Sequence, residues 1–297
     1  GAPGFTDSMR RAAFERIQDA IPEYIDNYKI MRKLGSGGMG IVFLAREPGL
    51  RRDVALKVLR PDAPPDSELK FLREAQITSQ LAHPGIMPVY HLGRDRNTGL
   101  SYYTMKFATG KTLSETMRDK TDRENEMRRL LRVYIDVCHA VAFAHSKNVI
   151  HRDLKPGNIW LGMYGEVLIL DWGLAMALER RRRKTTVLPS GIETDRRQGG
   201  MIDITGGPTS ADGDRPKFVG TPAYMSPEQA RGDISALTIH SDIYSLGAIL
   251  YEILTGHPPV EGETLNELLD AVRRSEIIPP HRRAPTRFIS PELSAIC

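Results

Sequence analysis

The spacing of hydrophobic positions changes several times along the chain, and each change marks a different structural element. Near the N-terminus Phe14, Ile17, Ile21 and Tyr24 recur at intervals of three or four residues, which is typical of one buried helix face. Pro22 weakens this pattern because proline has no backbone N–H to donate inside a helix. We therefore predict a partly helical N-terminal extension over residues 1–27, and we favour packing of its helix on the next segment over binding of a partner.

Residues 28–108 are dominated by short alternating runs that are broken by glycines. Alternation of apolar and polar positions with β-branched residues predicts strands, and 66–82 returns to helical spacing between them. The strand-like runs are YKIMRKLG, GIVFLARE, RDVALKVLR, IMPVYHLG and LSYYTMKFA. We predict a small antiparallel sheet of about five strands with one main helix.

The rest of the chain, residues 109–297, is mainly helical in pattern. Residues 127–148 form a long amphipathic stretch, and 241–256 are apolar on most faces, as expected of a helix at the centre of a lobe. Between them lies a stretch from about 176 to 217 that is rich in Arg, Gly, Thr, Asp and Pro and is typical of a long loop. The expected fold class is therefore α+β, with a small sheet lobe followed by a helical lobe.

Composition and charge narrow the classes of function. The chain has 297 residues, 40% of them hydrophobic, which is enough for a substantial core. Its net charge of +4 is not gathered into a stripe, so we expect no nucleic-acid partner. No apolar run approaches the ~20 residues that cross a bilayer. Only Cys138 and Cys297 are present, which excludes a disulfide framework and favours a cytoplasmic location, including that of a cytoplasmic domain in a larger membrane-anchored protein.

The stretch LGSGGMGIV places Gly35, Gly37 and Gly40 in G-x-G-x-x-G spacing. This spacing alone is a weak signal, because dinucleotide-binding folds use it between a strand and a helix. Here both flanks have strand patterns, so the glycines are expected at a hairpin tip, where backbone N–H groups can approach phosphates closely. The alternative is an ordinary glycine-rich turn.

Lys57 stands in the middle of a predicted strand. A lysine that points inward is costly to bury unless an anion meets it. Two anions are available, a nucleotide phosphate and the carboxylate of Glu74 on the predicted helix. The alternative is that Lys57 extends along an edge strand to solvent.

Two further motifs, HRDLKPGN at 151–158 and LILDWG at 168–173, carry the residue types of a phosphate-handling site. Asp153 can accept or orient the proton of an incoming hydroxyl, and Lys155 can neutralise a moving phosphoryl group. Asn158 and Asp171 offer hard oxygen ligands for magnesium. Phosphoryl transfer needs these charges held still around the phosphates more than it needs covalent chemistry.

Together these motifs resemble the protein kinase family from about Tyr28 to the end of the chain. The order matches: glycine-rich loop, VALK lysine, helix glutamate, HRDLKPGN, DWG for the family's DFG, and SPE at 226–228 for its APE. The lysine of HRDLKPGN and the stretch GTPAYMSPEQ resemble the serine/threonine branch, particularly bacterial kinases of the eukaryotic type. The resemblance implies transfer of the γ-phosphoryl group of ATP to Ser or Thr hydroxyls of protein substrates, with Mg²⁺ or Mn²⁺ as the cation.

The resemblance also implies roles for individual residues. Met105 would be the gatekeeper of the adenine pocket, and Trp160 would lie beneath the adenine, or else pack in the core. Thr221 would lie near Asp153 and Lys155 and help choose the acceptor hydroxyl, and Asp242 would hold the HRD loop from below. The other residues placed at the nucleotide are Leu34, Ser36, Gly38, Val42, Ala55, Lys106, Phe107 and Ala108.

Several positions depart from the family pattern or suggest regulation. Trp172 replaces the usual Phe, and its indole N–H needs a partner. The segment 171–228 is unusually long and includes the basic run 180–184, which either pairs with a phosphate or acidic partner or is a solvated insert. Arg152 is expected to meet a phosphorylated residue. The candidates are Thr205, Thr209 and Ser210, followed by Thr185 and Thr186.

The end of the chain suggests a helix start in ISPELSAIC, after which the family's last helices are missing. Glu228 is then expected to lack its usual arginine partner, and exposed apolar surface could favour a homodimer. The alternative function is a nucleotide-binding pseudokinase or scaffold, and a small-molecule kinase is a third. Five intact positions, Lys57, Glu74, Asp153, Asn158 and Asp171, argue against the scaffold, because a scaffold would not require all of them.

Overall fold

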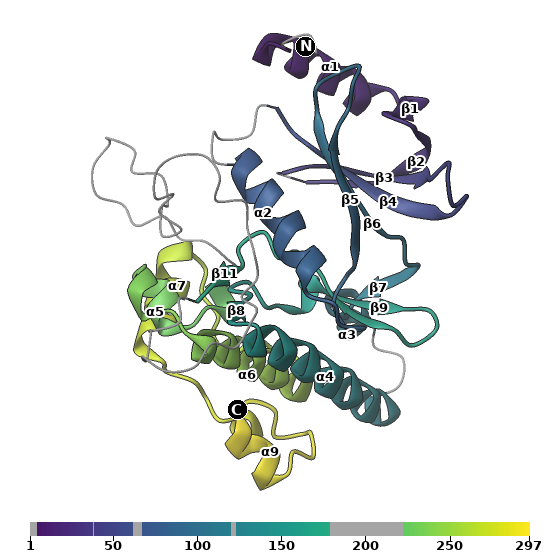
Figure 1. Ribbon diagram of the computed structural model, residues 1–297. Helices are drawn as coiled ribbons and strands as arrows, with labels where there is room; N and C mark the ends of the chain where they lie inside the picture. Colours follow the sequence, from purple (N-terminus) through teal and green to yellow (C-terminus); the bar gives the residue numbers. More distant parts are fainter. Residues whose placement is uncertain (1–4, 38, 62–66, 120–122, 179–221) are drawn as a thin grey trace, which may run out of the picture. The chain divides into compact units, whose positions relative to one another are not determined.

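The structure is a computed structural model that describes residues 5–37, 39–61, 67–119, 123–178 and 222–297. The chain divides into two compact units. Unit 1 comprises residues 1–82 and 87–109, and unit 2 comprises residues 83–86 and 110–297. Unit 1 contains an antiparallel sheet and unit 2 is mainly helical, so the predicted α+β class is confirmed (Figure 1).

Unit 1 is built around a six-stranded antiparallel sheet, one strand more than the sequence predicts. The strands are β1 (Tyr24–Ile25), β2 (Tyr28–Ser36), β3 (Gly40–Arg46), β4 (Asp53–Leu59), β5 (Val89–Arg94) and β6 (Ser101–Lys106), in the order β1-β2-β3-β4-β6-β5. The additional strand is β1, which pairs Ile25 with Tyr28. Two residues are too few to show an alternating pattern, so β1 was not predicted.

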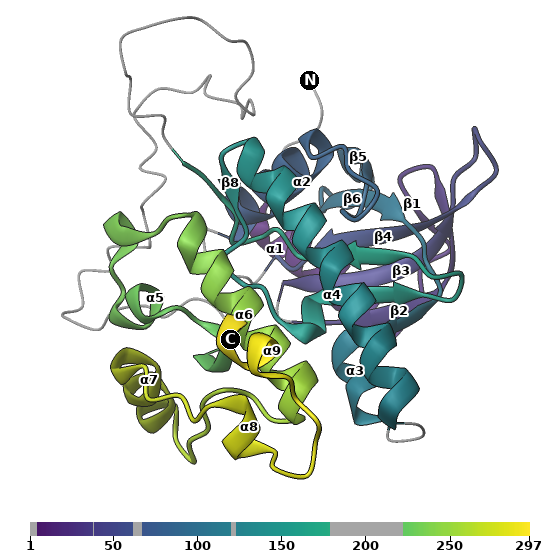
Figure 2. The same ribbon diagram turned by 90° about the horizontal axis from the view of Figure 1, so that it is seen from below.

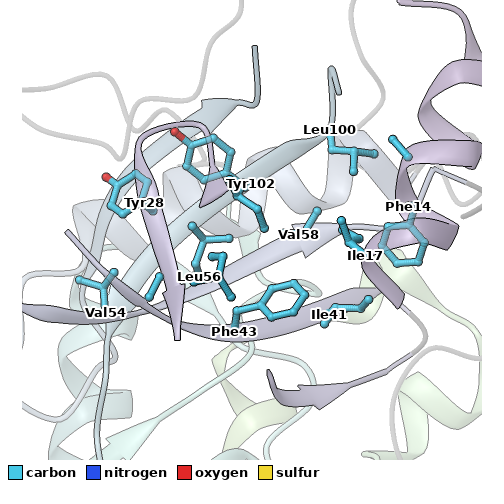
Figure 3. Packing of buried hydrophobic residues seen from close by; sticks show 14 residues of the cluster. Phe14, Ile17, Tyr28, Ile41, Phe43, Val54, Leu56, Val58, Leu100 and Tyr102 are labelled. Atoms are coloured by element: carbon cyan, nitrogen blue, oxygen red, sulfur yellow. The ribbon is translucent and has the colours of Figure 1, made fainter. Parts of the chain in front are cut away.

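Helix α1 (Asp7–Asp19) packs on one face of this sheet. Thr6 caps it by accepting a hydrogen bond from the backbone N–H of Met9, and the helix ends before Pro22. Phe14 and Ile17 are buried in the same apolar cluster as Ile41 of β3 (Figure 3). The N-terminal extension is thus part of the core of unit 1.

Helix α2 (Ser67–Gln80) packs through Phe71 and Ala75 against a second cluster that includes Tyr103. The neighbouring Tyr102 belongs to the cluster that contains Phe14. Because successive side chains of a strand point to opposite faces, adjacent tyrosines of β6 contribute to the two separate cores of unit 1.

Unit 2 combines helices with short strand pairs. Its elements are β7 (Gly110–Thr112), α3 (Leu113–Arg118), α4 (Arg123–Ser146), β8 (Val149–Ile150), η1 (Pro156–Asn158), β9 (Ile159–Gly162), β10 (Val167–Ile169), β11 (Met176–Ala177), η2 (Pro222–Tyr224), α5 (Pro227–Arg231), η3 (Ile234–Ala236), α6 (Ile239–Thr255), α7 (Leu265–Arg274), α8 (Pro280–Arg283) and α9 (Pro291–Ile296), where η denotes a short 3₁₀ helix.

Helices α4 and α6 lie side by side at the centre of unit 2 (Figure 2). Most residues of α6 are buried, in agreement with its apolar sequence. The short strand pairs β8–β11 and β9–β10 fix the ends of two loops, 151–155 before η1 and 170–175 after β10. These loops carry the HRD and DWG motifs.

Candidate active site

The glycine-rich stretch forms the predicted hairpin between β2 and β3. Gly37 and Gly40 exchange backbone hydrogen bonds, with N···O distances of 2.9 and 3.3 Å. A Cβ atom at Gly40 would lie 1.9 Å from the carbonyl oxygen of Val58, so only glycine lets β3 and β4 approach this closely. Leu34, Gly35 and Ser36 belong to β2, whereas Gly38 lies outside the described residues.

Lys57 of β4 is paired with Glu74 of α2. Its Nζ lies 2.9 Å from Oε1 and 3.1 Å from Oε2 of the carboxylate. The side chains are 15% and 4% exposed, so this is a largely buried ion pair. Sequence reasoning named both residues but missed a third, because the hydroxyl of Tyr103 also donates to Glu74 Oε1, at 2.7 Å. The sequence pattern does not single out Tyr103, because its position opposite Lys57 follows from the register between β4 and β6.

Three other unit 1 residues predicted to meet a nucleotide, Val42, Ala55 and Met105, lie on the same face of the sheet as Lys57. Val42 is the cross-strand partner of Lys57, and Ala55 is the partner of Met105. Directly opposed residues have side chains on one side of a sheet. Lys106 ends β6, and Phe107 and Ala108 follow it.

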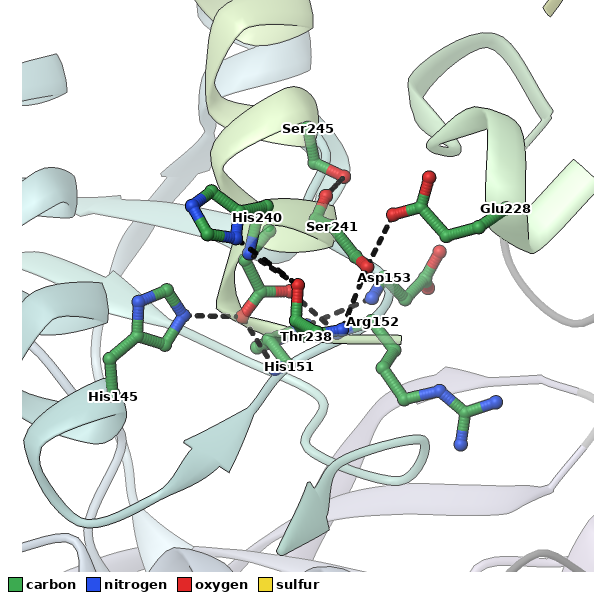
Figure 4. Close-up of polar contacts among 10 residues, drawn as sticks. His145, His151, Arg152, Asp153, Glu228, Thr238, His240, Ser241 and Ser245 are labelled. Carbon is green, nitrogen blue, oxygen red and sulfur yellow. Dashed lines mark hydrogen bonds and ion pairs between the residues drawn. The ribbon is translucent and has the colours of Figure 1, made fainter. Parts of the chain in front are cut away.

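In unit 2 the loop that carries the HRD motif is held by Asp242 of α6. This carboxylate is 1% exposed and accepts hydrogen bonds from the backbone N–H groups of His151 (2.8 Å) and Arg152 (2.9 Å). His145 Nε2 lies 2.8 Å from the same carboxylate. Figure 4 draws these contacts as dashed lines from His145, His151 and Arg152. A buried carboxylate that receives several N–H groups is a strong anchor for a backbone.

Asp153 is fixed by two residues that follow it closely in the sequence, Lys155 in the same loop and Asn158 in η1. Lys155 Nζ lies 2.7 Å from Asp153 Oδ2. Asn158 donates through Nδ2 to the Asp153 backbone oxygen (2.8 Å) and to Oδ2 (3.1 Å). Both bonds of Asn158 use its amide nitrogen, so the amide oxygen is the atom left to coordinate a cation. Asp153 is 9% exposed, and its carboxylate accepts at Oδ2 from both Lys155 and Asn158, which orients it in advance.

Asp171 follows β10 and has a positive φ of 57°. Its Oδ1 accepts a long hydrogen bond from the N–H of Gly173, at 3.3 Å. The adjacent Leu170 donates from its backbone N–H to the carbonyl of Asn158, at 2.8 Å, which ties the two loops together. Asn158 and Asp171 offer an amide oxygen and a carboxylate, which suit a hard divalent cation whose other ligands are phosphate and water.

His151 joins the same two loops. Its Nδ1 accepts from the N–H of Asp153 (3.2 Å), so Nε2 carries the proton and donates to the carbonyl of Leu170 (3.0 Å). Trp172 is 1% exposed, and its ring lies edge-on to the His151 ring with centroids 4.6 Å apart. The predicted partner for the Trp172 indole N–H is not found among the described residues. The indole N–H of Trp160 in β9 is also buried and likewise has no hydrogen-bond partner among the residues that the structure describes.

Arg152 is half-buried, with a positive φ of 70°. Figure 4 shows its guanidinium pointing away from the contacts at Asp242. Burial lowers the pKa of Arg152, and the Asp242 carboxylate opposes this effect. Its Nε has no hydrogen-bond partner within the described residues, which leaves a donor available to an anion.

Glu228, expected to lack its arginine partner, has a different one in the structure. Ser241 donates from its hydroxyl to Glu228 Oε1, at 2.6 Å. Burial raises the pKa of Glu228. The hydrogen bond from Ser241, hydrogen bonds from Ser226 and the Glu228 backbone, and the charge of Arg231 all lower it. Together they outweigh burial, so the pKa of Glu228 is lowered. A serine one residue before Asp242 thus links the SPE motif to α6.

Several predicted residues lie outside the described part of the chain. These are the acceptor-selecting Thr221, the basic run 180–184 and the phosphorylation candidates Thr185, Thr186, Thr205, Thr209 and Ser210. Where the structure does describe the chain, no helix is long and apolar enough to cross a membrane. Likewise, no group of three or more His, Cys, Asp and Glu side chains in these residues could hold a metal ion alone.

Comparison with known proteins agrees with the motif order. The chain is 42% identical to the serine/threonine-protein kinase PknD of Protochlamydia amoebophila over 281 residues. This aligned stretch covers 91% of this chain and 27% of that protein. It is 37% identical to PknD of Chlamydia felis over 283 residues, or 92% of the chain and 28% of that protein. It is 37% identical to the serine/threonine-protein kinase PknB of Mycolicibacterium smegmatis over 280 residues, which are 93% of this chain and 40% of that protein.

The chain therefore spans only about a quarter to two fifths of the length of these relatives. The model of the protein kinase domain matches residues 28–295, a range that begins at β2 and covers unit 1 from that strand onward and nearly all of unit 2. This match confirms the expected kinase-like fold class. The chain belongs to the protein kinase family.

Proposed function

We propose that this chain is the catalytic part of an ATP-dependent serine/threonine protein kinase. The observation that carries the proposal is the preoriented carboxylate of Asp153, held by Lys155 and Asn158 in a loop that Asp242 anchors from α6. This carboxylate can accept the proton of an acceptor hydroxyl, and Lys155 adds a positive charge beside it. The Lys57–Glu74 pair adds the cation that a nucleotide phosphate requires.

ATP supplies the γ-phosphoryl group when it is bound. Lys57 would bind phosphate oxygens, while Glu74 holds the ammonium in place. Gly35, Gly37 and Gly40 would present backbone N–H groups to the phosphates. Asn158 and Asp171 would hold the divalent cation, and we propose magnesium because their hard oxygens, supplemented by phosphate and water, match its ligand preference.

Protein substrates with Ser or Thr hydroxyls are proposed from the lysine of HRDLKPGN and from GTPAYMSPEQ, with Thr221 helping to select the acceptor. The curated relatives carry serine/threonine kinase names. We propose a cytoplasmic location, including that of a cytoplasmic domain in a larger membrane-anchored protein. We also propose that the chain can form a homodimer.

Regulation by phosphorylation is proposed from Arg152. A half-buried guanidinium that lacks a partner at Nε among the described residues offers a strong site for a phosphate. Thr205, Thr209 and Ser210 remain the first candidates to carry that phosphate. Mass mapping of phosphates on freshly purified protein identifies the residue.

The function is tested by incubating the chain with labelled ATP, magnesium and a generic basic protein. The Asp153→Asn variant should lose label transfer while it retains nucleotide binding, because the carboxylate that receives the proton is replaced by an amide. Asp270→Asn is the matched control, since within the described residues Asp270 forms a surface ion pair with Arg273 and has no contact with the loop that carries Asp153. Label should appear on serine and threonine. Nucleotide binding without any transfer by the unmodified chain would instead support a pseudokinase.

A further inference from the structure

Tyr103 contacts both members of the Lys57–Glu74 ion pair in unit 1. Its hydroxyl donates to Glu74 Oε1 at 2.7 Å, and its Cα partner in the neighbouring strand is Lys57. The Lys57 ammonium lies 5.4 Å from the centroid of the Tyr103 ring. A single side chain therefore donates to the anion and lies beside the cation.

The surroundings make this hydroxyl important for Glu74. Glu74 is 4% exposed and Tyr103 is 3% exposed, so water has little access to the carboxylate. Oε1 receives hydrogen bonds from both Lys57 and Tyr103, whereas Oε2 receives one from Lys57. A buried carboxylate that loses a donor loses both stabilisation and a constraint on its orientation.

The apolar cluster fixes the Tyr103 ring itself. Phe71 of α2 packs against Tyr103 with ring centroids 4.9 Å apart, and Phe71 is fully buried. Phe71 lies three residues before Glu74 on the same helix, so both side chains are on one helix face. The position of the hydroxyl relative to Glu74 is therefore set by the packing of α2 on β6.

We propose that Tyr103 is a positioning residue for phosphoryl transfer. Its hydroxyl holds the Glu74 carboxylate in the orientation in which both oxygens face Lys57, and thereby fixes the ammonium that binds the nucleotide phosphates. The effect on catalysis rests on the proposed kinase function, whereas the effect on Lys57 does not.

The chain offers a closely matched control in the adjacent residue. Tyr102 is also buried, and its hydroxyl donates to Asp26 Oδ2 at 2.8 Å, but it belongs to the opposite core, with α1. Tyr103→Phe and Tyr102→Phe each remove one hydroxyl that is bonded to a carboxylate. Only the first removal concerns Glu74.

Steady-state kinetics should separate the two variants. Tyr103→Phe is expected to lower kcat/KM for ATP by about tenfold, the effect of losing a hydrogen bond to a charged group, while the KM for the protein substrate stays unchanged. Tyr102→Phe should leave both values within about twofold of those of the unmodified chain. In a Glu74→Gln background, Tyr103→Phe should cost much less than it does alone, because the two residues act through one contact.

A chemical measurement tests the same contact without catalysis. Limited acetylation with acetic anhydride, followed by peptide mass mapping, reports how readily the Lys57 amine reacts. Tyr103→Phe should increase labelling of Lys57 relative to the exposed Lys29, and Tyr102→Phe should not. Equal kinetics and equal Lys57 labelling in the two variants would overturn the proposal. If the unmodified chain transfers no label, the proposed function fails, and the acetylation ratio still decides the role of Tyr103.

Discussion

The carboxylate of Asp242 accepts the backbone N–H of Arg152 at 2.9 Å across 90 residues of sequence. Together with its bond to the N–H of His151, this contact sets the path of the loop that carries Asp153. The loop conformation therefore depends on a helix in the middle of unit 2 as well as on its own sequence.

Replacing Asp242 with Asn should disrupt this anchor. An amide offers one oxygen, and its NH₂ group would face one of the two backbone N–H donors. We expect a loss of about 3 kcal/mol in the free energy of unfolding, measured by urea denaturation, because the hydrogen bonds to a carboxylate are weakened and one buried N–H is left without an acceptor. Displacement of Asp153 should lower kcat by about 100-fold. Asp270→Asn again serves as the control, and unfolding curves that coincide for the two variants would argue against the anchor.

The N-terminal helix should stabilise unit 1 although it precedes the matched kinase domain. Phe14 is 3% exposed and faces the sheet, and the Arg60 guanidinium lies 5.4 Å from its ring centroid. Phe14→Ala should cost about 3 kcal/mol, because it leaves a cavity between α1 and the sheet. Met9 is 53% exposed on the same helix, so Met9→Ala should cost less than about 0.5 kcal/mol. Equal costs would mean that α1 does not contribute its buried face to the core.

The sequence predicts the parts of the site that depend on local pattern. Lys57 lies inside an alternating strand and Glu74 inside a helical run, so their pairing can be expected from the sequence. Tyr103 could not, because its contact with Glu74 depends on the register between β4 and β6 and on the packing of α2. The partnership of Ser241 with Glu228 is similar, since only the fold brings these residues together.

Gly40 provides a test of the glycine-rich hairpin. A Cβ atom there would meet the carbonyl of Val58 at 1.9 Å, so Gly40→Ala must separate β3 from β4. We expect a loss of about 3 kcal/mol in stability from this overpacking. At Gly37 a Cβ atom would have no neighbour within 4 Å among the described residues, so Gly37→Ala should change stability by less than about 0.5 kcal/mol. Thermal unfolding of both variants checks the contrast, and a Gly40→Ala variant as stable as the unmodified chain would contradict the close approach.

Two glutamates of unit 2 should affect stability with opposite dependence on pH. Burial raises the pKa of Glu252, although the hydrogen bond from the Tyr224 hydroxyl opposes this effect. The folded state therefore binds the Glu252 proton more tightly than the unfolded state does. Its contribution to stability is present below the ordinary value of 4.5 and is lost as pH rises through the raised pKa.

Glu228 should behave in the opposite way, because the bond from Ser241 helps to lower its pKa. Its contribution is present above 4.5 and is lost as pH falls through the lowered pKa. Relative to the unmodified chain, Glu252→Gln should therefore gain stability as pH rises from 4.5 to neutrality. The stability lost through Glu228→Gln should be largest at neutral pH. In acid, the stability of this variant should approach that of the unmodified chain. Urea denaturation across this range measures both trends. Parallel curves for the two variants would show that the pKa values of Glu252 and Glu228 are not shifted in opposite directions in the folded chain.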